Sequence, residues 1–248
     1  LGFVEVMAED FSPEALPPAV RRLSERGLKV VPHGVSLSLG GADPPAPERL
    51  AHLGRLARAV QAPLVSEHLA FVRAGHRESG HLLPLERSRE SLDVVVENVR
   101  RAADSLPVPL AVENIATLVE WPLPEMDEAD FLSEVVNRAG CGLLLDITNV
   151  YANSRNHGYD PLDFLDRIPL DRVAYVHVAG GMERNGLYLD THAHPIQPGS
   201  LELLEELFAR SEPPGVLLER DDNFPGQEDF QAELDALRAA MDRGRARR

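Results

Sequence analysis

Cysteine is almost absent from this sequence, which has one, Cys141, among 248 residues. A single thiol excludes an internal disulfide framework and is typical of the reducing cytosol. Because Cys141 leads into an apolar segment, we expect a buried thiol and not a nucleophile. No apolar run approaches the roughly 18 residues that a membrane span needs, and no signal-peptide pattern is present. We therefore expect a cytoplasmic protein without membrane contact.

Positive charge is also scarce. There are 25 Lys and Arg residues against 40 Asp and Glu, which gives a formal net charge of −15. Nucleic-acid binding depends on clustered Lys and Arg, so this balance argues against nucleic acid as a partner. No Gly-x-Gly-x-x-Gly turn follows the first strand-like segment, which disfavours a doubly wound dinucleotide-binding sheet.

What the chain does have is an alternation of short apolar segments with amphipathic ones. Strands are expected at residues 1–8, 28–39 (strongest over 34–39), 63–71, 109–113, 142–146, 172–178 and 215–219. Helices are expected at residues 13–26, 47–60, 88–105, 127–139, 161–167, 200–210 and 227–243. Strands that alternate with helices indicate a parallel sheet.

We predict one α/β domain over residues 1–248, a TIM-type (β/α)8 barrel, because the length is close to that of a typical barrel. Only seven strand–helix units are present, so the first strand is apparently missing from this chain. A seven-stranded or open barrel is the alternative, and a doubly wound sheet is a third, weaker choice.

The segment from residue 189 to 195 is the densest cluster of potential metal ligands. It contains Asp190, His192 and His194 within five residues. In extended backbone these alternate side chains would lie on one face and could converge on an ion. Imidazole with carboxylate suits zinc, iron or manganese better than calcium or magnesium. A hydrogen-bonded loop cluster is the alternative interpretation.

Further ligand-type residues stand at or near the ends of most expected strands, where the active site of a parallel barrel lies. Together with the segment above they give eight candidate ligands, namely His33, His68, Glu113, Asp146, His177, Asp190, His192 and Glu219. One ion needs three or four protein ligands, so eight are enough for two or three ions.

Each candidate also has a structural interpretation. A histidine after a strand is often simply buried and hydrogen-bonded. Glu113 or Glu219 can pair with an arginine such as Arg220, and Asp146 can cap a turn. These explanations account poorly for the common position of the candidates, because burying so many ionisable groups at one barrel mouth is costly without cations.

Three polar residues near these ends are candidates for other roles. His157 lies in an expected loop at 151–160, which we predict to be a lid or a substrate contact. His194 is a second candidate lid or substrate contact, and because it precedes a proline we favour a loop-supporting role for it. Asp222, after the last strand, is a third candidate lid or substrate contact.

The order and spacing of seven motifs resemble one known family, the multinuclear non-haem iron-dependent oxidative enzymes (MNIO), formerly a domain of unknown function. The matching segments begin at His33-Gly34-Val35-Ser36-Leu37, Ser66-Glu67-His68-Leu69, Val112-Glu113-Asn114 and Asp146-Ile147-Thr148-Asn149-Val150-Tyr151. They continue at His177-Val178-Ala179-Gly180, Asp190-Thr191-His192 and Glu219-Arg220-Asp221-Asp222-Asn223. The resemblance covers nearly the whole chain.

The resemblance implies a xylose-isomerase-like barrel that holds two or three irons, with zinc or manganese as substitutes. It also implies oxidation of cysteine or another residue of a ribosomally made peptide with dioxygen, the peptide being presented by a partner protein. Carried over by position, it adds Asn149 to the ligands, although an amide is a poor iron ligand and a turn-forming role is the alternative. Chains of the family open with a glycine-rich first strand, which we do not find ahead of Phe3.

Two other functions fit the same residues. A hydrolase or isomerase of this barrel type, of sugar isomerase or abasic endonuclease kind, would use divalent ions to polarise oxygens and lower the pKa of water. A non-catalytic metal-binding scaffold is the second alternative.

Overall fold

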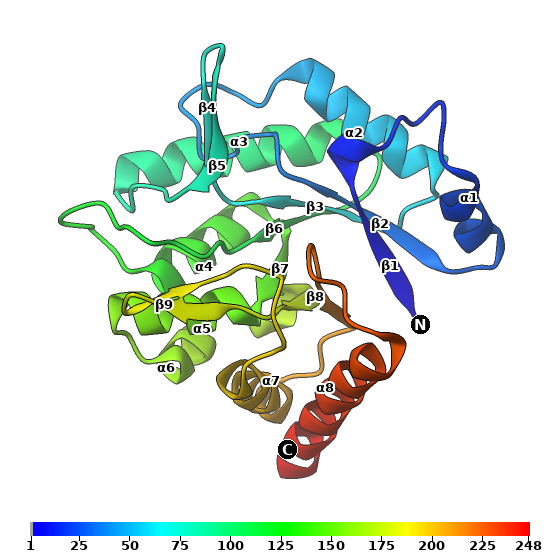
Figure 1. The fold of residues 1–248 in the computed structure, drawn as a ribbon. Coiled ribbons are helices and arrows are strands. Elements are labelled where there is room, and N and C mark those ends of the chain that lie inside the picture. The colour runs from blue at the N-terminus through cyan, green and yellow to red at the C-terminus, as the bar shows by residue number, and fades with distance from the viewer. Residues whose placement is uncertain (1) are drawn as a thin grey trace. The chain divides into compact units, whose positions relative to one another are not determined.

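Parallel strands, each followed by a helix, form the frame of the protein in a computed structural model, which describes residues 2–248 (Figure 1). Residue 1, where the first strand was expected to start, lies outside the described residues. The chain forms two compact units. The first runs to Glu113 and includes Trp121–Leu143, and the second contains Asn114–Glu120 and Leu144–Arg248. One domain over residues 1–248 stays a prediction.

The first unit contains four parallel strands in the order β1-β2-β3-β6, together with four α-helices and a hairpin. Its strands are β1 (Phe3–Met7), β2 (Lys29–Gly34), β3 (Val65–His68), β6 (Leu110–Glu113) and the antiparallel pair β4 (Phe71–Ala74) and β5 (Arg77–Leu83). Its helices are a 3-10 turn η1 (Ala8–Asp10), α1 (Pro18–Glu25), α2 (Pro47–Ala59), α3 (Arg89–Ser105) and α4 (Glu128–Ala139).

The second unit continues with strands in the order β7-β8-β11 and with helices between them. Its strands are β7 (Gly142–Asp146, which begins in the first unit), β8 (Val173–Val178), β11 (Val216–Leu218) and the antiparallel pair β9 (Met182–Arg184) and β10 (Leu187–Leu189). Its helices are α5 (Ile147–His157), α6 (Pro161–Arg167), η2 (Leu170–Arg172), α7 (Pro198–Arg210) and α8 (Gln227–Arg247). In Figure 1, α8 packs along α7.

Local sequence explains why most helices begin and end where they do. The Ser88 hydroxyl accepts a hydrogen bond from Ser91 N at the start of α3, and the Asp127 carboxylate caps α4 in the same way. Gly140 ends α4 with a φ of 72°, a left-handed conformation that glycine adopts without strain. The centre of β7 is apolar, and its Leu143, Leu144 and Leu145 are fully buried. This is the pattern of parallel strands that are covered on both faces.

Several expected boundaries were wrong. The second strand ends at Gly34, so the expected strand over residues 34–39 is a loop, and the first helix begins at Pro18 and not at Pro13. The segment between the expected third strand and third helix, which contains Gly75 and Gly80, forms the β4–β5 hairpin. The predicted lid loop at 151–160 is wrong, because residues up to His157 form α5. Among residues 2–248 no helix is long and apolar enough to cross a membrane.

Candidate metal centre

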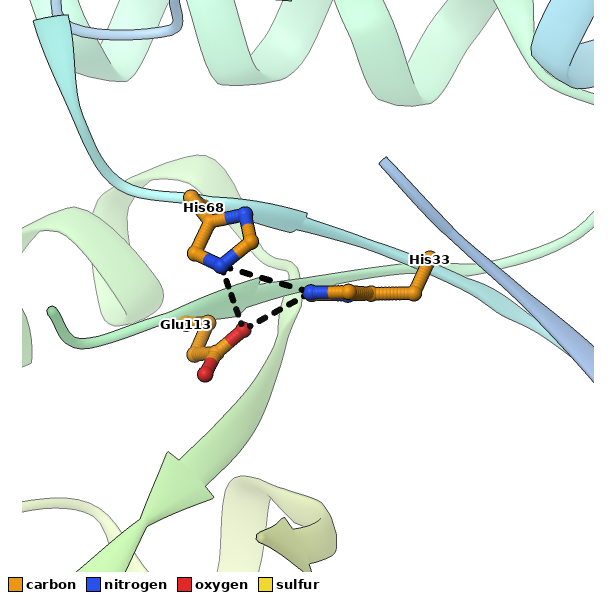
Figure 2. A group of neighbouring side chains, drawn as sticks. All are labelled: His33, His68 and Glu113. Carbon is orange, nitrogen blue, oxygen red and sulfur yellow. Dashed lines mark hydrogen bonds and ion pairs between the residues drawn. The ribbon is translucent and has the colours of Figure 1, made fainter. Parts of the chain in front are cut away.

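Three predicted ligands meet at the carboxyl ends of β2, β3 and β6, and we call them the first ligand group: His33, His68 and Glu113 (Figure 2). Glu113 Oε2 lies 3.2 Å from His33 Nε2 and 3.4 Å from His68 Nε2. The two Nε2 atoms are 3.4 Å apart. An ion with bonds of about 2.0–2.2 Å separates neighbouring ligands by roughly 3.0–3.5 Å, so this triangle has the size of one face of a metal coordination shell.

Backbone and side-chain contacts orient both imidazoles of the first ligand group. His68 Nδ1 is 2.9 Å from the Gly34 carbonyl oxygen, which can only accept, so Nδ1 carries the proton. In neutral His68 the Nε2 lone pair therefore points at Glu113 and His33. His33 Nδ1 is 2.8 Å from the Ser66 hydroxyl. Such contacts behind a histidine fix its ring and tautomer for metal binding.

The carboxyl group of Glu67 lies directly behind this group and was not among the predicted site residues. It is 1% exposed and accepts hydrogen bonds from Leu37 N at 3.0 Å and His68 N at 2.9 Å. Burial raises the pKa of Glu67 to about 8, although these two N–H groups act in the opposite direction. Glu67 lies in the motif Ser66-Glu67-His68. Because neighbouring residues of a strand point to opposite faces, the sequence did not indicate that Glu67 would be buried beside the ligands.

The second ligand group contains Asp146, His192 and Glu219, whose ligand atoms all lie within 4.8 Å of one another. His192 Nε2 is 2.8 Å from Asp190 Oδ2, and its Nδ1 is 3.5 Å from Glu219 Oε2. His177 Nδ1 lies 3.0 Å from Glu219 Oε2. The structure thus brings five of the predicted ligands together within the second unit.

Negative charge dominates the second ligand group. Burial disfavours the charged form of His192, but the hydrogen bonds that its imidazole donates to Asp190, Asp221 and Glu219 outweigh this and raise its pKa. Burial also opposes the charged form of Glu219, while His177 and His192 lower its pKa well below the usual value.

The remaining predicted residues have distinct positions. Asn149 Nδ2 donates to the Asn114 carbonyl, and its backbone N–H bonds the capping carboxylate of Asp146 at 2.8 Å. His194 Nδ1 lies 2.7 Å from the Thr191 hydroxyl, away from Asp190 and His192, in a loop-supporting contact. The expected alternation fails because His192 has a φ of 50°, which turns the backbone out of extended geometry.

His157 and Asp222 have no contact with either ligand group in the hydrogen bonds and ion pairs of the described chain. His157 ends α5, with Nε2 2.8 Å from the Thr117 hydroxyl and Nδ1 3.5 Å from Glu120. Asp222 is exposed, and its carboxylate accepts from Asn223 N. The neighbouring Asp221, which sequence reasoning passed over, lies 3.1 Å from His192 Nδ1.

Two buried oxygen atoms of the second unit test whether these residues fit a metal. Asn149 Oδ1 and Asp190 Oδ1 are buried and have no hydrogen-bond partner. A buried acceptor without a partner is costly, and a cation would satisfy both atoms. Imidazole and carboxylate donors suit iron, zinc or manganese. The residues present therefore fit a divalent metal in each unit.

Comparison with known proteins agrees with this geometry. The sequence model of the RiPP precursor modification enzymes MbnB/TglH/ChrH, which act on ribosomally made peptides, matches residues 1–242. A UPF0276 protein of Streptomyces avermitilis is 51% identical over 254 residues, which is all of this chain and 52% of that protein. A UPF0276 protein of Caulobacter vibrioides is 38% identical and is matched over 99% of this chain and 88% of its own length. The chain thus spans about half of the first relative.

Solved structures show the fold. D-psicose 3-epimerase from Clostridium cellulolyticum superposes with a TM-score of 0.61 at 13% identity, over 97% of this chain and 89% of the other. A xylose isomerase domain protein from Planctomyces limnophilus gives 0.57 at 16% identity, over 97% and 88%. The predicted xylose-isomerase-like TIM-barrel fold is confirmed. By its sequence the chain belongs to the MbnB/TglH/ChrH family of RiPP precursor modification enzymes, the MNIO family that its motifs resemble.

Proposed function

We propose that this protein is an iron-dependent enzyme that oxidises a residue of a ribosomally made peptide with dioxygen, cysteine being the first candidate. The observation that carries the proposal is the first ligand group, in which three ligand atoms from three strands lie 3.2–3.4 Å apart. Membership of a peptide-modifying family supplies the substrate class.

The two ligand groups have different tasks in this proposal. His33, His68 and Glu113 hold one ion, and the second ligand group with Asp190 holds another, so each chain binds at least two. His177 and Asn149 belong to the second unit and complete its donor set. Ferrous iron held by these residues would supply the chemistry with dioxygen.

In this proposal the protein orients the metal ligands and keeps water away from them. Gly34 and Ser66 hold the imidazoles of the first ligand group in place. Because Glu113, His33 and Asp146 are almost fully buried, water is excluded from these donors, which strengthens their attraction for a cation. We further propose that a partner protein presents the peptide, and that neither nucleic acid nor a membrane takes part.

Reconstitution tests the proposal. Anaerobically purified protein is loaded with ferrous iron and mixed with a cysteine-containing peptide and the partner protein that presents it. Oxygen uptake and the mass of the peptide are then measured. We expect oxygen consumption and a changed peptide mass with iron, and neither with zinc. Glu113→Gln should abolish both, whereas Glu97→Gln, which changes an exposed carboxylate on α3, should not.

Metal analysis of the purified protein separates the alternatives. Iron in the protein, at two or more ions per chain, agrees with oxidation. Retention of zinc or manganese with hydrolysis or isomerisation of a test substrate would contradict the proposal and favour the divalent-metal hydrolase or isomerase. Metal that binds without any turnover would favour the non-catalytic metal-binding scaffold, and failure to bind any divalent metal would contradict all three functions.

A further inference from the structure

One carboxylate of α8 contacts both of the loops that supply ligands to the second ligand group. Glu233 Oε1 accepts a hydrogen bond from Ile196 N at 3.0 Å, and Glu233 Oε2 forms an ion pair with the Arg220 guanidinium. Ile196 lies in the loop that carries Asp190, and Arg220 directly follows Glu219. The proposed function leaves Glu233 without a role.

The two loops also contact each other directly. Asp221 N donates a hydrogen bond to the His192 carbonyl at 2.9 Å. One hydrogen bond still allows two loops to turn about it. Glu233 provides a second point of attachment, and it connects both loops to the same helix.

The rest of α8 holds Glu233 in place. Leu237, Ala240 and Gly244 of this helix are buried, and α8 packs along α7 (Figure 1). A Cβ at Gly244 would lie 2.3 Å from the Glu205 carbonyl oxygen, so the two helices are in backbone contact there. Glu233 therefore stands on a rigid element, whereas the residues it contacts are in loops.

The ion pair of Glu233 with Arg220 is a poor source of stability. The side chain of Arg220 is 4% exposed and that of Glu233 14%. Taking two charges out of water costs about as much free energy as their attraction supplies. Arg220 Nε is moreover buried without a hydrogen-bond partner in the described chain. Apolar side chains of similar size would hold α8 as firmly, so the pair is better explained by the positions that it gives to the two loops.

We propose that Glu233 is a positioning residue for the second ligand group: it holds Arg220 and Ile196, and through them the loops that carry Glu219 and Asp190. This rests on the proposed function only in requiring a divalent ion at that group. It does not depend on iron, on dioxygen or on the peptide.

Cobalt titration of the metal-free protein tests this without turnover. The binding step that His192→Ala removes identifies the second ligand group. In Glu233→Gln we expect cobalt binding about threefold to tenfold weaker at this step, a changed cobalt absorption spectrum, and no change at the first ligand group. Glu228→Gln, which changes an exposed carboxylate at the start of the same helix, should match wild type.

A double variant separates positioning from stability. Arg220→Met combined with Glu233→Leu replaces the ion pair with apolar side chains, which should keep the unfolding temperature of the metal-free protein close to that of wild type. We expect its cobalt affinity at the second ligand group to stay as low as that of Glu233→Gln, because Ile196 N has lost its acceptor. If the double variant does not fold, Glu233→Gln alone decides.

The outcomes distinguish this inference from the proposed function. Equal cobalt affinity at the second ligand group in wild type and Glu233→Gln, or wild-type affinity in the double variant, would overturn the role of Glu233 and leave the metal site standing. Equally weaker binding at both ligand groups would mean that Glu233 supports the fold in general, which also overturns it. Wild type that binds no cobalt at the second ligand group would overturn both the inference and the proposed function.

Discussion

Glu67 carries a carboxyl group whose surroundings favour its neutral form. Burial raises its pKa to about 8 from an ordinary value of 4.5. Between these two values the folded protein keeps a proton that the unfolded chain releases. Since stability rises with pH only where the unfolded state binds more protons, this group makes stability fall as pH rises from about 4.5 to 8.

Replacement of Glu67 should remove that pH dependence. We expect the metal-free wild type to lose up to about 1.4 kcal/mol per pH unit from this one group within the window. Glu67→Gln should lack this pH-dependent part of the free energy of unfolding, even if the amide lowers stability by a constant amount at every pH. Urea unfolding at several pH values measures it as the difference between the two proteins, with Glu97→Gln as the exposed control. If the free energy of unfolding depends on pH in the same way in wild type and in Glu67→Gln, the prediction is wrong.

Residue types at the strand ends were readable from the sequence, but their pairing was not. Asp221 and Asp222 are chemically identical neighbours, and only the fold decides that Asp221 contacts His192 while Asp222 faces solvent. The left-handed backbone at His192 could not be foreseen either, because only a few per cent of non-glycine residues adopt it. Whether the predicted residues bind metal stays a prediction.

At the scale of elements, the segment that carries Asp190 and His192 depends on a glycine across from it. A Cβ at Gly180 would lie 1.7 Å from the His194 carbonyl oxygen, so only glycine allows this approach. Gly180→Ala must push the 190–195 segment away. We expect about tenfold or greater loss of metal affinity at the second ligand group and none at the first.

Isothermal titration of the metal-free protein with cobalt distinguishes the two binding steps. Gly226→Ala is the matched control, because a Cβ there meets nothing within 4 Å and the backbone φ is −62°. Unchanged binding in Gly180→Ala would show that the 190–195 segment is not held by this contact.

Helix α5 shows why one element was missed. Its first residues, Ile147-Thr148-Asn149-Val150, favour a strand or a turn over a helix. Tertiary contacts override this preference: Asp146 caps the helix, and Asn153 bonds the backbone of the preceding loop at Ile115 and Thr117. The β4–β5 hairpin was also missed, because the mostly polar strand β5 carries no clear alternation.

The amide of Asn153 should be the strongest single contact of α5. It is fully buried, accepts from Thr117 N at 2.8 Å and donates to the Ile115 carbonyl at 2.9 Å. Asn153→Ala leaves both backbone groups without a partner and should destabilise the protein by about 2–4 kcal/mol. Ser154→Ala, on the same helix, should cost less than about 1 kcal/mol. Urea unfolding compares the two, and equal costs would contradict this account.

For the whole molecule, the alternation of seven strands with helices was enough to predict the barrel, because periodicity and chain length limit the choices. Residues 2–248 contain seven parallel strands, four in the first unit and three from β7 onward. The alternation of strands and helices does not predict the irregular backbone that follows each strand. The loop after β11 places Asp221 beside His192, and Asp221 was not selected as a site residue from the sequence.

Metal binding should stabilise the whole molecule in two separable parts. An ion that binds only the folded protein adds RT ln(1 + [L]/Kd), about 2.7 kcal/mol at a hundredfold excess over Kd. For a chain of this size that is roughly 5–10 °C in Tm per ion. His68→Ala removes a ligand of the first group and His192→Ala one of the second, so each should lose about half of the rise in Tm that cobalt causes in wild type.

The control is His81→Ala, which changes an exposed histidine in β5 and should keep the whole rise in Tm. Loss of the entire rise in either single variant would mean that the two ligand groups bind metal as one cooperative centre and not as two.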